Sequence, residues 1–140
     1  MKSQLRTGAS GDRNVTNVSP HGMRVLVVED EMMVSMLLED MLSDIGCTLV
    51  GPAKTVKSAL KLIEHAGFDI AILDVNLNGD ESYPIADALA ARAIPFVFAS
   101  GYGISGLRAQ YRSIPLLQKP FQQRELEGTL AAVLSGRPGL

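Results

Sequence analysis

Five side chains of this sequence have the chemistry to handle a charged ligand, and each stands at the end of an apolar run. They are Glu29, Asp30, Asp74, Ser100 and Lys119. An acid at such a position is often only a helix cap, and a single lysine or serine is usually a surface or turn residue. The recurrence of such side chains at four run ends favours one shared site.

The three acids predict a metal site. Carboxylates held close together repel one another, which raises their pKa values unless a cation neutralises them. Mg²⁺ is the best fit, because it takes oxygen ligands from a few carboxylates, a carbonyl and water and leaves positions for phosphate. We expect Asp30, Asp74 and the main-chain carbonyl of Asn76 to bind the metal directly. Glu29 acts through a water molecule in this hypothesis, although it can also be a solvated acid in the first turn of a helix.

A carboxylate beside Mg²⁺, with an amine and a hydroxyl close by, predicts a site for phosphoryl capture. Asp74 attacks the phosphorus, while the metal and Lys119 neutralise the equatorial oxygens. Ser100 donates a hydrogen bond to the same group. The predicted product is an aspartyl phosphate.

The pattern of apolar residues predicts five strands that alternate with five helical segments. Continuous β-branched runs are typical of buried strands, and apolar residues at i, i+3, i+4 and i+7 are typical of helices. The strands are expected at Arg24–Val28, Thr48–Gly51, Phe68–Val75, Pro95–Ala99 and Ile114–Gln118. The first helix is expected to bury Val34, Leu37, Leu38, Met41, Leu42 and Ile45. The fourth segment, Ile104–Tyr111, gives only a weak helical signal because Gly106 lies inside it.

Four residues mark where helices begin and end. Gly46 is expected to follow the first helix as a left-handed cap, and Gly67 to end the second. Thr55 is the predicted N-cap of the second helix. Pro84 lies in the first turn of the third, where its missing N–H costs nothing.

Short connections between the elements imply right-handed crossovers and a parallel sheet covered on both faces. Two of these connections are Pro52–Lys54 and the polar loop Asn76–Ser82. We predict an α/β fold, a flavodoxin-like (βα)5 doubly wound parallel sheet with strand order 2-1-3-4-5. The first and third strands are neighbours in this order, so Asp30 and Asp74 are expected to lie side by side.

The bulk properties exclude several classes of function. A chain of 140 residues with 46% apolar and 20% charged residues predicts one domain with a substantial core. The net charge of -2 and the pI near 5.6 indicate no basic surface for nucleic acid. The single cysteine, Cys47, allows neither an internal disulfide nor a cysteine zinc site. No apolar run reaches the roughly 18 to 20 residues of a membrane span, so we expect a cytoplasmic protein.

Composition also predicts the domain boundaries. Residues 1–22 are rich in Ser, Thr, Asn, Gly and Arg and predict a disordered leader. Residues 23–136 form the predicted domain, and residues 137–140 a flexible tail. Neither Cys47 nor the two histidines, His21 and His65, have a partner at ligand spacing, so no chemical role is expected for them.

The motifs around these side chains resemble those of CheY-like receiver domains, which belong to bacterial two-component response regulators. The similarity runs from Met23 to about Leu134, and it is carried by the motifs Val25–Glu31, Ile72–Leu77, Ala99–Gly101 and Gln118–Phe121. The resemblance implies that Asp74 is the phosphoacceptor, Glu29 and Asp30 the acids that bind Mg²⁺, Ser100 the phosphate-sensing hydroxyl and Lys119 the cation that contacts the phosphoryl group. It also implies a cis bond between Lys119 and Pro120, which turns the lysine inward.

One departure from the common receiver concerns how the signal leaves the site. Common receivers carry Tyr or Phe three residues before the lysine, where this chain has Leu116. The stretch Pro95–Tyr102 is instead similar to the signature of FATGUY receivers, with Ser100 in place of Thr. Those proteins are associated with alphaproteobacterial signalling and often with kinases of the HWE type. Tyr102, between two glycines, is therefore a candidate switch residue, unless it only packs on the surface.

The resemblance implies a stand-alone response regulator in a phosphorelay. A sensor histidine kinase, with the HWE type as one candidate, or a phosphotransfer protein donates phosphate to Asp74 with Mg²⁺. The added charge changes the surface after the fourth strand for a protein contact, or the domain serves as a phosphate sink. The chain ends soon after the last helix, so no effector domain is expected.

Two other functions use similar folds. A Mg²⁺-dependent phosphatase can work through an aspartyl phosphate, but it commonly needs an acid two residues after the nucleophile, where this chain has Asn76. A flavin or nucleotide carrier needs a glycine-rich phosphate loop after the first strand, and this chain has acids there. Both are therefore weaker hypotheses than the phosphoacceptor.

Overall fold

The computed structural model describes residues 19–103 and 106–135. Its main strands are β1 (Arg24–Val28), β2 (Thr48–Ala53), β3 (Ile70–Asp74), β6 (Phe96–Ser100) and β7 (Leu116–Gln118). Its α-helices are α1 (Met32–Ile45), α2 (Val56–His65), α3 (Tyr83–Ala91) and α4 (Gln123–Ser135). A small hairpin joins β4 (Asn76–Leu77) to β5 (Asp80–Glu81), and a 3-10 helix, η3, spans Ala109–Tyr111.

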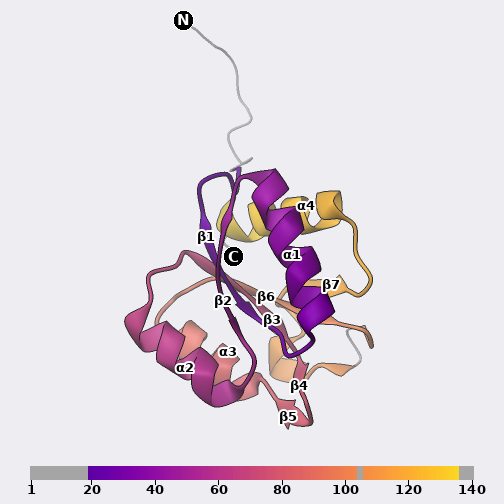
Figure 1. Ribbon diagram of the computed structural model, residues 1–140. Helices are drawn as coiled ribbons and strands as arrows, with labels where there is room; N and C mark the ends of the chain where they lie inside the picture. The colour runs from indigo at the N-terminus through magenta and orange to yellow at the C-terminus, as the bar shows by residue number, and fades with distance from the viewer. Residues whose placement is uncertain (1–18, 104–105, 136–140) are drawn as a thin grey trace, which may run out of the picture.

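The five main strands form one parallel sheet in the order β2-β1-β3-β6-β7 (Figure 1). Counted along the chain without the hairpin strands, this is the predicted order 2-1-3-4-5. The flavodoxin-like α/β fold is confirmed. The two central strands, β1 and β3, pair with each other over four residues, from Val25 with Ile70 to Val28 with Leu73.

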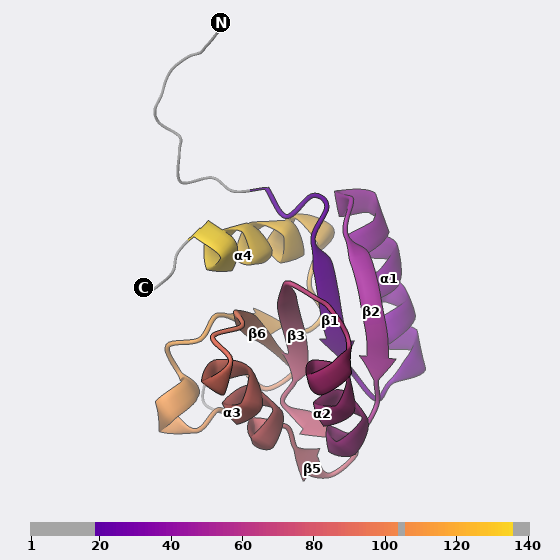
Figure 2. The same cartoon turned by 90° about the vertical axis from the view of Figure 1, so that its left-hand side faces the viewer.

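Helices cover both faces of the sheet. Figures 1 and 2 show α1 and α4 on one face and α2 and α3 on the other. Side chains alternate along β1, so Val25 and Val27 pack under α1 and α4, while Leu26 and Val28 pack under α2 and α3. Two buried clusters therefore sandwich the sheet. Among the described residues, none of the helices has both the length and the apolar character to span a bilayer.

The predicted helix ends are partly correct. Gly46 follows α1 in the left-handed conformation with φ of 95°, and Thr55 caps α2 by accepting a hydrogen bond from the amide of Ser58. The prediction for Gly67 is wrong, because α2 ends at His65 and Ala66 is already extended. Gly67 instead lies against the guanidinium of Arg24, which occupies the space a Cβ would need.

Two predicted connections contain strand structure. β2 continues through Pro52 to Ala53, and the Ala53 carbonyl accepts a hydrogen bond from the amide of Glu29 at 2.9 Å. Proline is tolerated there because β2 is an edge strand. The predicted loop Asn76–Ser82 holds the β4–β5 hairpin, whose turn residues Asn78 and Gly79 both have positive φ.

Fewer apolar side chains of the first helix are buried than predicted. Leu38, Leu42 and Ile45 are buried, but Leu37 is 53% exposed. Ser35 takes the remaining buried position and donates a hydrogen bond from its hydroxyl to the carbonyl of Met32. The stripe that faces the sheet is therefore narrower than the apolar stripe of the sequence.

The predicted fourth helix is not an α-helix in the described residues. Residues 104 and 105 of that prediction lie outside them, and the regular structure that follows is the short η3. Residues 1–18 of the predicted leader and the predicted tail also lie outside the described part. Residues 19–22 of the predicted leader lie within the described part. They are bonded to the domain, since the Pro20 carbonyl accepts hydrogen bonds from the Met23 amide and the Cys47 thiol. The folded chain thus begins before Met23.

Candidate functional site

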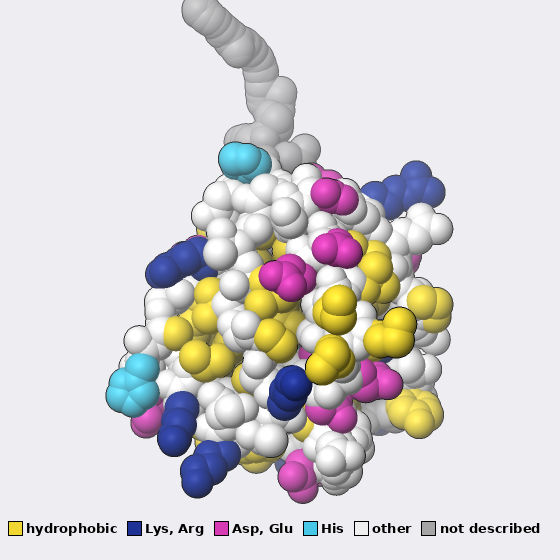
Figure 3. All heavy atoms as spheres, in the orientation of Figure 1, with side chains coloured by type: hydrophobic (Ala, Val, Ile, Leu, Met, Phe, Trp, Pro, Cys, Tyr) yellow, Lys and Arg dark blue, Asp and Glu magenta, His cyan; other side chains and the backbone are white. Residues whose placement is uncertain are grey.

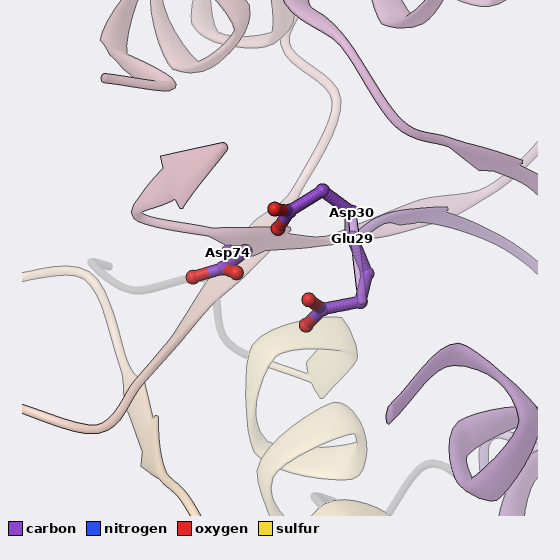
Figure 4. A group of neighbouring side chains, drawn as sticks. All are labelled: Glu29, Asp30 and Asp74. Atoms are coloured by element: carbon purple, nitrogen blue, oxygen red, sulfur yellow. The ribbon is translucent and has the colours of Figure 1, made fainter. Parts of the chain in front are cut away.

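The three predicted acids meet at the carboxyl ends of the two central strands. Glu29 and Asp30 directly follow β1, and Asp74 is the last residue of β3. Because these strands are paired in register, one carboxylate oxygen from each of the three residues falls within 4.8 Å of the others. Figure 4 shows the side chains bordering one space between the strand ends.

Ser100 and Lys119 reach the same place from the neighbouring strands. Ser100 is the last residue of β6, and its carbonyl accepts a hydrogen bond from the Lys119 amide at 2.8 Å. The peptide bond between Lys119 and Pro120 is cis. The Lys119 ammonium lies 2.7 Å from Glu29 Oε1 and 3.3 Å from Asp74 Oδ2.

Burial shifts the proton affinities of this cluster. Loss of solvent raises the pKa of Glu29, which is 2% exposed, and the bond from Lys119 offsets only part of this effect. Loss of solvent likewise raises the pKa of Asp74 despite the nearby ammonium. For Lys119, burial alone would lower the pKa, but its contacts with Glu29 and Asp74 outweigh burial and the pKa is raised. Glu29 and Asp74 are therefore costly to ionise in this site, and both contact the Lys119 ammonium.

The donor set fits Mg²⁺ by its chemistry. The three acids offer only oxygen atoms, which hard divalent cations prefer. Burial raises the pKa of Glu29 and of Asp74, and a bound cation would favour their ionised forms. Near them, the Asn76 amide donates to Asp74 Oδ1 at 3.3 Å, which places Asn76 beside the cluster. The role of its main-chain carbonyl as a ligand stays a prediction.

A cavity of about 740 Å³ opens over these groups. Its lining includes six predicted residues, namely Asp30, Asp74, Asn76, Ser100, Tyr102 and Lys119. It also includes residues that sequence reasoning did not select, namely Glu31, Val75, Asn78, Glu81, Gly101 and Gly106. Glu31 could have been predicted to line the cavity, because it directly follows Asp30. Glu81 reaches the cavity only through the β4–β5 hairpin, and Gly106 only through its position after β6.

The two switch candidates lie in different surroundings. Tyr102 is 84% exposed, and its amide donates a hydrogen bond to Ser100 Oγ at 3.0 Å. Leu116 is partly buried on β7, where it pairs with Phe98 and packs against the core. Of these two residues, Tyr102 lines the cavity over Asp74 and Leu116 does not.

Exposed apolar side chains gather beside the site. Large ones on the first half of α1 are Met32, Met33, Met36 and Leu37. Figure 3 shows hydrophobic side chains over this part of α1, with acidic side chains above them. This surface adjoins Lys119 through a groove that Glu31 and Phe121 also line.

Comparisons with known proteins agree with this geometry. The model of the response regulator receiver domain family matches residues 25–131. The structure is similar to that of SdrG from Sphingomonas melonis Fr1, with 46% sequence identity and a TM-score of 0.73, over 84% of this chain and 99% of that chain. SdrG has also been solved in a BeF3-activated conformation, which is 48% identical with a TM-score of 0.71 over 79% of this chain and 95% of that chain.

Two further relatives are larger than the matched region. The response regulator PhyR from Brucella abortus is 25% identical with a TM-score of 0.73, over 85% of this chain and 50% of that chain. The sensory transduction protein LytT of Bacillus cereus is 31% identical over 112 residues, which are 77% of this chain and 46% of that protein. The chain thus spans about half the length of the curated relatives it matches.

Proposed function

Because this chain belongs to the response regulator receiver domain family, we propose that Asp74 accepts a phosphoryl group from a phosphohistidine, with Mg²⁺ as the cofactor. Receiver domains are signalling proteins that interact with histidine kinases or phosphotransfer proteins, and are not classical enzymes. We propose further that this domain promotes its own phosphorylation and dephosphorylation at Asp74.

One observation supports the proposal most directly. The Lys119 ammonium lies 3.3 Å from the Asp74 carboxylate at the point where Glu29 and Asp30 also converge. Four ionisable side chains from three strands converge there, and two of them, Glu29 and Asp74, are buried. A purely structural cluster would avoid this arrangement, because a buried charge is costly.

The residues divide the reaction among them. An Asp74 oxygen forms the new bond to phosphorus, while the bond from phosphorus to the donor histidine nitrogen breaks and that nitrogen keeps the electron pair. Lys119 and the Ser100 hydroxyl stabilise the charge on the phosphoryl oxygens. Asp30, Asp74 and the Asn76 carbonyl would hold Mg²⁺, with Glu29 as an indirect partner, and the metal would supply positive charge for the carboxylates and the phosphoryl group.

The family and the relatives support the proposed partners. We propose a sensor histidine kinase, with the HWE type as one candidate, or a phosphotransfer protein as donor. The similarity to SdrG, which takes a BeF3-activated conformation, supports a response to a phosphoryl group at Asp74. The buried, unpaired Cys47 agrees with a reducing, cytoplasmic location.

The test is phosphorylation in vitro. Wild type, Asp74→Asn and Asp80→Asn are incubated with acetyl phosphate and Mg²⁺ and weighed by intact mass spectrometry. Asp80 is the matched control, an exposed acid on β5 of the same loop. We expect one phosphate adduct on wild type and Asp80→Asn and none on Asp74→Asn.

Two results would contradict the proposal. An adduct on Asp74→Asn would place the modification elsewhere. Continuous release of inorganic phosphate without a lasting adduct on wild type would favour the Mg²⁺-dependent phosphatase.

A further inference from the structure

The hydroxyl of Tyr83 is buried and hydrogen-bonded on two sides. Tyr83 is the first residue of α3 and is 2% exposed. Its hydroxyl accepts a hydrogen bond from the Arg108 amide at 2.9 Å and donates one to the Gly106 carbonyl at 3.4 Å. One phenolic oxygen thus connects the start of α3 to the chain after β6. Because a buried polar group that loses its partner is costly, this connection resists opening.

The ring of Tyr83 fixes where this hydroxyl lies relative to β6. It stacks on Tyr111 with a centroid distance of 5.4 Å and an interplanar angle of 7°. It also meets the ring of Phe98 edge-on at 6.1 Å. Phe98 belongs to β6 and precedes Ser100 by two residues. The aromatic contacts therefore tie the hydroxyl to the strand that carries Ser100.

Arg108 adds a second, weaker connection. Its guanidinium lies 4.4 Å from the centroid of the Tyr83 ring and 3.1 Å from Glu81 Oε1. Both partners of this ion pair are more than half exposed, so solvent screens the pair. The buried hydroxyl is the stronger of the two connections.

Hydrogen bonds lead from Tyr83 to Ser100. The Gly106 amide donates to the Gly103 carbonyl at 3.2 Å. Tyr102, which precedes Gly103, donates its amide proton to Ser100 Oγ at 3.0 Å. Gly106 also lies against Tyr102, whose Cβ is 3.5 Å from where a side chain on Gly106 would begin. The Tyr83 and Ser100 hydroxyls are therefore the two ends of one series of contacts along the cavity wall.

We propose that Tyr83 is a positioning residue for Ser100. Its hydroxyl holds Gly106 and Arg108 in place, and through Gly103 and Tyr102 this orients the Ser100 hydroxyl toward the phosphoryl group on Asp74. The inference deepens the proposed function and rests on it for the role of Ser100. Tyr83 does not line the cavity over Asp74, so its effect passes through Gly106, Gly103 and Tyr102.

The test compares two variants that each remove one phenolic oxygen from the same stacked ring pair. Tyr83→Phe loses both hydrogen bonds but keeps the ring. Tyr111→Phe is the matched control, because no hydrogen bond of its hydroxyl is found within residues 19–103 and 106–135. Both proteins are first shown to be folded by urea unfolding and are then compared by ¹⁵N NMR and by the rate of phosphorylation with acetyl phosphate and Mg²⁺.

In Tyr83→Phe we expect amide exchange at Arg108 to rise about tenfold, since its acceptor is lost. The amide signals of Ser100 and Tyr102 shift, and the initial phosphorylation rate falls at least about threefold because the hydroxyl is less well oriented. Tyr111→Phe keeps wild-type values for all three.

Tyr83→Phe with unshifted Ser100 and Tyr102 amides would overturn the inference, whatever happens at Arg108. Shifted amides with a wild-type phosphorylation rate would overturn it as well, because Ser100 would then not need this support. Equal effects of Tyr83→Phe and Tyr111→Phe would show a packing role only. If wild type takes no phosphate at all, the proposed function fails, while the amide shifts still decide whether Tyr83 positions Ser100.

Discussion

The two sides of the acidic cavity are held by different means. Glu29, Asp30 and Asp74 stand at the ends of β1 and β3, central strands that are paired on both edges. On the other side, the chain after Ser100 has no α-helix before β7 in its described part, and side-chain contacts with Tyr83 and Tyr111 hold it. The sheet therefore fixes the positions of the acids. The opposite wall of the cavity, formed by the chain between Ser100 and β7, can change its conformation when a few side-chain contacts change.

The largest expected effect concerns the rings under the opposite wall. Phe98 is fully buried and meets Phe96, Tyr83 and Tyr111. Phe98→Ala should lower the free energy of unfolding by about 4 kcal/mol, through lost apolar contact and a cavity. Urea unfolding measures this loss.

Leu130→Ala on α4 is the matched control for Phe98→Ala, since Leu130 is equally buried under the opposite face. It should lower stability by about 3 kcal/mol, but only Phe98→Ala should accelerate amide exchange at Gly106 to Tyr111 in the native state. Equal local acceleration in both variants would contradict the contrast between the two sides of the cavity.

A smaller effect is expected on the acid side. Burial raises the pKa of Asp74 and Glu29, so the folded protein binds more protons than the unfolded one above the ordinary carboxyl range. Stability then falls as pH rises from about 4 through the raised pKa values. Asp74→Asn removes one of these ionisations and, without Mg²⁺, should raise the free energy of unfolding at pH 7 by about 1 kcal/mol.

Urea unfolding between pH 4 and 8 checks this prediction, with Asp80→Asn as the exposed control. The Asp74→Asn variant should also show a flatter pH dependence than wild type. A loss of stability in Asp74→Asn would mean that the contact between Lys119 and Asp74 stabilises the fold more than burial of the carboxylate costs.

The acid side could be predicted from the sequence because its geometry follows from strand order. Once Arg24–Val28 and Phe68–Val75 are recognised as neighbouring strands, Asp30 and Asp74 must meet, whatever the loops do. Lys119 and Ser100 follow in the same way from the ends of the next two strands. The residue types indicate the chemistry, the family resemblance implies the role of each residue, and the strand order gives their position.

The opposite wall could not be predicted in this way. Tyr83 looks like one apolar residue at the start of a helix, and its partner Arg108 lies 25 residues further on, with no periodic pattern to connect them. The prediction for Gly67 failed for a similar reason, since its use as space for Arg24 depends on a contact between distant segments. Leu37 fits the helical pattern, but only the packed sheet shows that the stripe stops short of it.

Replacing either of two glycines, Gly103 or Gly128, by alanine should change stability by about 1 kcal/mol or less, with opposite signs. Gly103, after β6, has φ of 74°, and a Cβ there would lie 3.9 Å from Gln118 Oε1, an ordinary contact distance. Gly103→Ala should therefore cost about 1 kcal/mol of stability through the backbone. Gly128 lies in α4, exposed and with no neighbour within 4 Å, so Gly128→Ala should gain roughly 0.5–1 kcal/mol. Thermal unfolding should therefore show a loss of stability for Gly103→Ala and a gain for Gly128→Ala. A gain of stability in Gly103→Ala would contradict the strained backbone conformation at this residue.

The smallest effect on stability, and the most informative about signalling, is expected at Tyr102. Its side chain is 84% exposed, so Tyr102→Ala should change stability by less than about 0.5 kcal/mol. Its amide nevertheless contacts Ser100 Oγ, and the FATGUY similarity of this stretch stays a prediction. We expect the variant to bind beryllofluoride with Mg²⁺ but to give a different pattern of amide shifts from Gly101 to Tyr111. Tyr102→Phe, which keeps the ring, should give the wild-type pattern. If Tyr102→Ala also reproduces that pattern, the ring has no part in the response, and the change in the wall must pass through the backbone between Ser100 and Gly106.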